Sequence, residues 1–183
     1  MRFNARLSGL AMLFAVSVAG VTPAYGASIN SGNIGLISSR VRMMQQNINA
    51  ALHHGFGFTV NEFTSAEDAF AGVEKDVLET TGTEIAIQNA LSTAAMRVAN
   101  SVTRVDQMQS LINIGADSAS VNAQAVMLCT EVAGARALVA GSKLRATTSF
   151  DAGIYAQGTA LYFSMSSAID DAVFVTQTAQ CGF

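Results

Sequence analysis

The residues of this chain whose types could support chemistry are two histidines, two cysteines and two pairs of adjacent acids. His53 and His54 are the only histidines, and the acids nearest to them are Glu62, Glu67 and Asp68. A zinc site needs four ligands arranged as a tetrahedron. Adjacent histidines at a helix end point in different directions, so they are poor candidates to share one metal ion. We expect an exposed pair near a helix C-terminus, where partial negative charge favours imidazolium.

The two pairs of adjacent acids are Glu67-Asp68 and Asp170-Asp171. Asp170 and Asp171 could support acid–base catalysis only inside a pocket, and adjacent carboxylates at a helix end are usually solvated. The sequence has neither a Cys-x-x-Cys-His haem motif nor a nucleophile elbow. Gly55-Phe56-Gly57 and Gly141-Ser142-Lys143 are only fragments of nucleotide-binding loops, because the spacing of the full motifs is missing. We therefore expect no enzymatic activity, no metal site and no cofactor.

Cys129 and Cys181 are the only cysteines, and an even count in an exported chain predicts a disulfide. If the last two helices form a regular hairpin, Cys129 faces Met165, and Cys181 lies about 16 residues, or ~24 Å, beyond it. The Cα atoms of a disulfide lie within about 7 Å of each other. We therefore expect the last helix to end near Asp170-Asp171 and the tail to fold back. The alternative is a bond that joins two chains.

The elements that would position these side chains are helices, because apolar residues recur at alternating spacings of three and four in long stretches. The only proline, Pro23, precedes all of these stretches. This spacing places the apolar side chains on one stripe of each helix, and the stripes must pack against each other. The sequence predicts an all-α, elongated antiparallel helical bundle with coiled-coil-like packing. The stripes are Ile34, Ile37, Val41, Met44, Ile48, Leu52; Leu91, Ala95, Val98, Val102, Val105, Met108, Ile112; Val121, Ala125, Leu128, Val132, Ala135, Val139; and Ile154, Leu161, Met165, Ala168, Ala172, Val175, Ala179.

Capping signals divide the chain into about five helices. Ser65-Ala66-Glu67-Asp68 and Thr81-Gly82-Thr83-Glu84 resemble capping boxes. Gly115-Ala116-Asp117-Ser118 resembles a helix stop followed by a new N-cap. The expected helices lie near residues 33–53, 65–80, 84–114, 118–145 and 150–170, with a long hairpin over about 84–145.

Residues 1–26 have the features of a secretory signal peptide. Two arginines precede an apolar run from Leu10 to Val21, which is shorter than the about 20 residues that span a bilayer. Ala24-Tyr25-Gly26 offers small residues for cleavage, so we expect a mature chain of one domain over residues 27–183. The alternative is an anchor that is never removed. We expect no transmembrane segment in the mature chain, and a location in the periplasm or outside the cell.

The composition predicts a weakly charged, acidic surface. Charged residues make up 13% of the chain, against about 25% in an average protein. Removal of Arg2 and Arg6 with the leader leaves eight basic and thirteen acidic residues, a net charge of −5. This balance excludes the basic patch that nucleic-acid binding requires. Low charge is typical of exported proteins and also of surfaces that pack against partners, and both interpretations stay open.

Residues 53–64 place Phe56, Phe58 and Phe63 and two glycines between helices. Aromatic side chains in a glycine-rich loop can contact a partner or a membrane surface. The alternative is that they cover the end of the core. We treat the three phenylalanines as candidates for partner contact.

Long amphipathic helices with few charges predict a protein that packs against copies of itself or against other proteins. At the level of architecture alone, exported bundles rich in Ala, Asn and Gln resemble subunits of surface appendages and of secretion or conjugation machinery. We interpret the chain as an exported structural or interaction protein, a subunit or accessory of a cell-envelope assembly. The alternative is a periplasmic helical-bundle module that binds a small apolar ligand or a metal.

Overall fold

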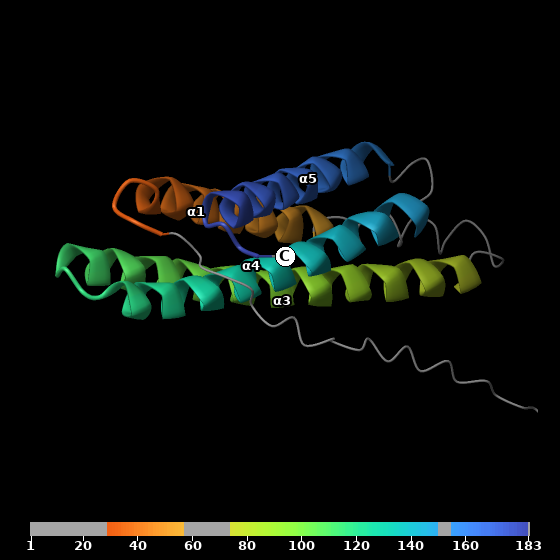
Figure 1. Ribbon diagram of the computed structural model, residues 1–183. Coiled ribbons are helices and arrows are strands. Elements are labelled where there is room, and N and C mark those ends of the chain that lie inside the picture. Colours follow the sequence, from red (N-terminus) through yellow and green to blue (C-terminus); the bar gives the residue numbers. More distant parts are fainter. Residues whose placement is uncertain (1–28, 57–73, 150–154, 183) are drawn as a thin grey trace, which may run out of the picture.

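The computed structural model describes residues 29–56, 74–149 and 155–182, and these residues form a helical bundle (Figure 1). Its helices are α1 (Ile34–Phe56), α3 (Glu74–Asn113), α4 (Ser118–Ser149) and α5 (Tyr155–Thr178). The predicted all-α fold class is therefore confirmed. The predicted signal peptide over residues 1–26 and the predicted capping box at residues 65–68 lie outside the described residues.

The helices pack in the cyclic order α1, α3, α4, α5, each against its two neighbours. In Figure 1, α3 and α4 lie side by side as a long pair, and α1 and α5 lie over them. α3 has 40 residues and is therefore about 60 Å long, which makes the bundle elongated. α1 and α5 are antiparallel, because the side-chain amide of Asn33 at the start of α1 donates to the carbonyl of Thr178 at the end of α5.

The core consists of the apolar stripes that the sequence predicted. Most of their members are buried, while Leu52, Ala95, Val102 and Ile112 pack at the edge of the core. Each large apolar side chain buried in this way stabilises the fold by about 1.5–3 kcal/mol. The largest fully buried side chains all belong to the predicted stripes: Ile34, Ile37, Val41, Met44, Ile48, Leu91, Val98, Val105, Met108, Leu128, Val132 and Met165.

The turn between α3 and α4 lies where the sequence placed it. α3 ends in a Schellman motif, in which the amide of Ala116 donates to the carbonyl of Leu111 and Gly115 adopts a φ of 68°. Asp117 then caps α4, since its carboxylate accepts a hydrogen bond of 2.7 Å from the amide of Ser120. This bond lowers the pKa of Asp117 below its ordinary value. The short turn forces α3 and α4 into an antiparallel hairpin.

The predicted end of the last helix near Asp170-Asp171 is wrong, because α5 continues to Thr178. The run that follows these acids favours β structure by propensity. However, Val175 and Ala179 are fully buried, so packing against the other helices overrides that propensity. α5 also ends in a Schellman motif, with the amide of Cys181 donating to the carbonyl of Thr176 at 2.9 Å.

The predicted disulfide joins Cys129 to Cys181 within one chain, and the two Cα atoms lie 5.7 Å apart. The prediction that the tail folds back is also confirmed. Gln180 reverses the chain with a φ of 54° and directs Cys181 toward α4. α4 continues to Ser149 and α5 begins only at Tyr155, so the register that places Cys129 opposite Met165 does not hold, although α5 does pack against α4. Cys181 therefore reaches Cys129 although α5 is longer than predicted.

The predicted break at Thr81-Gly82-Thr83-Glu84 is also wrong. α3 continues through this segment without interruption from Glu74 to Asn113. A glycine inside a helix costs only about 1 kcal/mol, which the rest of a long helix can offset. The described part of the predicted helix 65–80 is therefore the first turns of α3.

Candidate functional site

The histidines and phenylalanines that the sequence singled out lie near the end of α1 or beyond it. His53 is exposed in the last turns of α1. His54 and Phe56 belong to the same helix, but their side chains lie outside the described residues, as do Phe58 and Phe63. Within the described ranges, no group of three or more His, Cys, Asp or Glu side chains could hold a metal ion. The role of the phenylalanines in partner contact stays a prediction.

The two acids of the Asp170-Asp171 pair have different environments. Asp170 is exposed as expected, but the expectation of a solvated Asp171 is wrong, because this side chain is only 3% exposed. Its Oδ1 accepts a hydrogen bond of 3.0 Å from Nη1 of Arg40. Its Oδ2 accepts one of 2.9 Å from Nδ2 of Asn47. The carboxylate is occupied on both oxygens, so it fixes α5 against α1 rather than providing acid–base chemistry.

A second ion pair fixes α3 against α4. Nη1 of Arg97 lies 3.1 Å from Oε2 of Glu131. The same guanidinium lies over Gly134, where an added Cβ would come within 2.9 Å of Nη1 of Arg97. The glycine therefore allows the arginine to lie flat across α4 and reach its acid. This pair is structural as well.

The first feature without a structural explanation is the side of α4 that faces away from the core. Its exposed large side chains include Val126, Met127 and Leu144, with exposed fractions of 39%, 45% and 66%. Between them stand small residues and one threonine, and the charged residues at the edges are Arg97, above Gly134, and the exposed Arg136 and Arg145 of α4. We name this surface the outer α4 face; it comprises Ala119, Ala123, Val126, Met127, Thr130, Ala137, Gly141 and Leu144.

The composition of α4 follows from having two apolar sides. Over Ser118–Ala146 the helix is long and apolar enough to cross a membrane, with a mean hydropathy of 1.3, and 39% of the segment is buried in the bundle. Length and composition of this kind are also found in core helices. The inner stripe packs against α3 and α5, whereas the outer α4 face contacts no other described helix. The expectation that the mature chain has no transmembrane segment stays a prediction.

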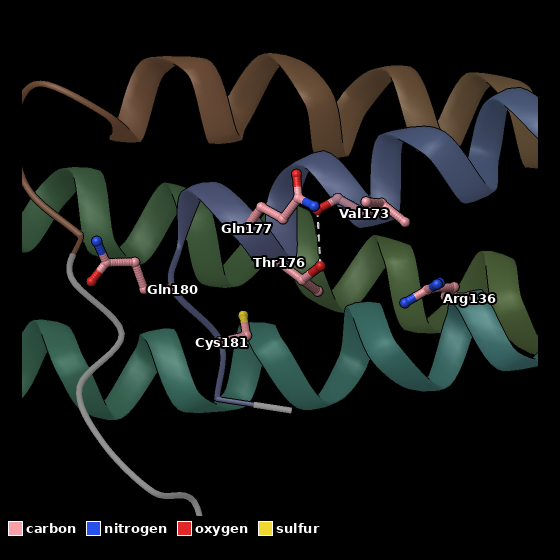
Figure 2. A pocket seen from close by; sticks show the side chains of 6 residues that line it. All are labelled: Arg136, Val173, Thr176, Gln177, Gln180 and Cys181. Carbon is pink, nitrogen blue, oxygen red and sulfur yellow. Dashed lines mark hydrogen bonds between the residues drawn. The ribbon is translucent and has the colours of Figure 1, made fainter.

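The second feature is a groove beside the disulfide, with a volume of about 490 Å³. Figure 2 shows that one lining side chain comes from α4, and that the others come from the end of α5 and from the tail. Most of the described lining residues are polar, and none of them is acidic. The lining residues are Arg136, Val173, Thr176, Gln177, Gln180 and Cys181.

Sequence reasoning missed this groove, which we name the α4–α5 groove. It exists because the disulfide holds the tail against α4, so residues far apart in the chain form one wall. Neither the spacing of the lining residues nor their types form a motif. The disulfide itself was the only signal in the sequence that the tail would lie against α4.

Compared with known proteins, the chain matches no protein-family model, no curated protein and no solved structure. The function is therefore inferred from the outer α4 face and the α4–α5 groove.

Proposed function

We propose that this chain is an exported structural or interaction protein, a subunit or accessory of a cell-envelope assembly, which acts by helix packing. The observation that carries the proposal is the outer α4 face. Its eight residues carry no charge from Ala119 to Leu144, over a length of about 38 Å, and the exposed Arg136 and Arg145 of the same helix flank it. A surface helix normally carries polar residues on the side that faces away from the core, so an apolar outer side indicates a covering partner.

The outer side of α3 provides an internal comparison, because α3 lies beside α4 and is also exposed to solvent. Ile85 and Met96 are exposed on α3 as well, but most of its outward positions carry polar side chains, such as Asn89, Thr93, Asn100, Thr103 and Gln107. The low charge of the whole chain does not by itself account for the apolar character of the outer α4 face. Contiguous exposed apolar surface of this kind marks sites of protein–protein contact.

Small side chains on the outer α4 face support a helix as the partner element. Ala123, Ala137 and Gly141 let a second backbone approach closely, while Met127 and Leu144 provide apolar contacts. The partner is a helix of another copy or of another envelope protein. The leader features and the disulfide support an oxidising compartment, the periplasm or the cell exterior.

A charge placed in the middle of the outer α4 face tests this proposal. Thr130 is exposed, and among the described residues its hydroxyl bonds only to the carbonyl of Val126 in its own helix. The variant Thr130→Glu should abolish self-association, or a complex of fixed stoichiometry, in native mass spectra and sedimentation, while the helical circular dichroism stays unchanged. Thr130→Ala should retain the complex. Asn100→Glu adds the same charge to the outer side of α3 and should have no effect.

Two results would count against the proposal. One is a protein that stays monomeric at high concentration and forms no stoichiometric complex in its compartment. The other is a complex that Asn100→Glu disrupts as strongly as Thr130→Glu, which would indicate a general response to negative charge.

The alternative function, a module that binds a small ligand, has a specific place in the α4–α5 groove. The polar and cationic lining does not suit the small apolar ligand that we considered from the sequence. It suits a different class of ligand.

A further inference from the structure

The α4–α5 groove contains a cation that the fold does not use. Within the described residues, Arg136 forms no ion pair and no hydrogen bond. Four other arginines are bonded to acids or amides: Arg40 to Asp171, Arg42 to Asp106, Arg97 to Glu131, and Arg104 to Gln107 and Gln124. Each of these joins helices or turns of a helix. Among the described residues, no carboxylate lines the groove, and the N–H donors of Arg136 have no partner.

The second unusual feature of the groove is the backbone of Gln180. Its φ of 54° lies in the left-handed region, which costs a residue with a Cβ about 1 kcal/mol or more. The equivalent position of the other Schellman motif is Gly115, which adopts its φ of 68° without that cost. Glycine at position 180 would therefore be the more stable choice. The glutamine side chain that stands there instead lines the groove.

The lining offers three kinds of contact to a ligand. The guanidinium of Arg136 can donate two parallel N–H bonds to a carboxylate. The amides of Gln177 and Gln180 can each donate and accept a hydrogen bond. Val173 and the sulfur of Cys181 provide a small apolar wall. In Figure 2, Arg136 and Gln180 lie at opposite ends of the group of labelled side chains, with Cys181 and Thr176 between them.

We propose that the α4–α5 groove binds an elongated carboxylate. The carboxylate pairs with Arg136, the body of the ligand lies along Val173 and the disulfide, and a polar group at the far end bonds to the amide of Gln180. The volume of about 490 Å³ lies within the range of small-ligand sites, about 300–1,000 Å³. A free organic acid and the carboxyl end of a peptide share this chemistry.

The test uses the full disulfide-bonded protein, purified without reductant, in an NMR titration that follows the backbone amides. The probes are succinamate, which carries a carboxylate and an amide, and acetyl-trialanine with a free carboxyl end. Succinamide has the length of succinamate without the charge and serves as the control.

We expect amide shifts at Arg136 and along 173–181 with at least one acid, and none with succinamide. Binding of succinamate alone would indicate a small acid, and binding of acetyl-trialanine alone would indicate a peptide. No shift with either acid at about 10 mM, which corresponds to less than ~3 kcal/mol of binding, would overturn the proposal.

Two variants distinguish specific binding in the groove from nonspecific attraction of an acid to surface charge. Arg136→Gln should weaken binding about tenfold or more, as expected for loss of a charge-assisted pair. Arg145→Gln removes a charge from another exposed position of α4 and should leave binding unchanged. Equal weakening by both variants would overturn the proposal.

Gln180→Gly gives the sharper result. Glycine adopts the left-handed backbone conformation without steric cost, so the unfolding midpoint should rise. Loss of the side-chain amide of Gln180 should weaken binding about three- to tenfold. A more stable protein with unchanged affinity would show that the ligand does not reach Gln180. The proposed binding mode would then be wrong. Failure of this site leaves the outer α4 face unaffected, since none of its residues lines the groove.

Discussion

Reduction of the disulfide should remove a large part of the stability of this bundle. The bond closes a loop between Cys129 and Cys181, which are separated by 52 positions in the sequence. In the chain-entropy description, closing a loop of this length lowers the conformational entropy of the unfolded chain. The loss raises the free energy of unfolding by about 4 kcal/mol at 25 °C. Small domains are typically stable by about 5–15 kcal/mol in total. We therefore expect a loss of about 3–4 kcal/mol.

The folded state should survive this loss with most of its helices. α5 packs more extensively against α1 than against α4, and its last turns are held by buried Val175 and Ala179 as well as by the disulfide. Only the tail beyond Ala179 depends on the bond for its position against α4. Far-UV circular dichroism of the reduced protein should therefore change little below the unfolding transition.

Urea unfolding of the oxidised protein, the reduced protein and the variant Cys129→Ala/Cys181→Ala measures the effect. The unfolding midpoint should fall equally in the last two. The m-value should rise, because the unfolded chain without the bond exposes more surface. A loss below about 1 kcal/mol would refute the loop-closure reasoning and indicate a compact unfolded state. A halved mass on reduction would show that the bond joins chains in solution.

The remaining predictions concern single side chains, and urea unfolding measures the first three. Asp171→Ala should destabilise the protein by about 2 kcal/mol, less than the 3–5 kcal/mol of a fully buried pair because its arginine partner is 40% exposed; an effect below ~0.5 kcal/mol would contradict this. Gly115→Ala should destabilise and Gln180→Gly should stabilise, each by about 1 kcal/mol, and effects of the same sign would contradict the Schellman comparison. Ser142→Ala should stabilise by up to ~1 kcal/mol, because the buried hydroxyl of Ser142 has no partner among the described residues; a loss would reveal a bond to buried water. Asp117 should stabilise α4 above about pH 4 and lose this effect as the pH falls through its lowered pKa, so Asp117→Asn should flatten the acid limb of a thermal-melt pH profile; an unchanged limb would exclude the cap as its cause.

The two candidate surfaces make different demands on the bundle. The outer α4 face needs only a straight, apolar helix, which the long hairpin of α3 and α4 supports. The α4–α5 groove needs the tail to be held in one place, which the disulfide and the left-handed Gln180 achieve. A reductant should therefore weaken binding in the groove and leave association through the outer α4 face intact.

The sequence determined the helices, the core and the turn between α3 and α4. The reason is that these features depend on local spacing: a three-four pattern defines one side of a helix, and Gly115 followed by Asp117 ends one helix and begins the next. The pairing of Cys129 with Cys181 was also predictable, because the chain has no other cysteine. The sequence did not predict that α3 is one helix in place of two shorter ones. The capping pattern at Thr81 competes with continuation of the helix, and the outcome depends on packing.

Only the tertiary structure decided the position of α5 and the features that follow from it. Whether α5 packs chiefly on α1 or on α4 depends on contacts between stripes that look alike in sequence. That choice buries Asp171 and leaves Asp170 in solvent, although the two are chemically identical neighbours. It also brings Arg136 and Gln180 to one groove across 44 positions of sequence. Local spacing specifies which side of each helix is apolar, but the meeting of distant side chains depends on how the helices cross.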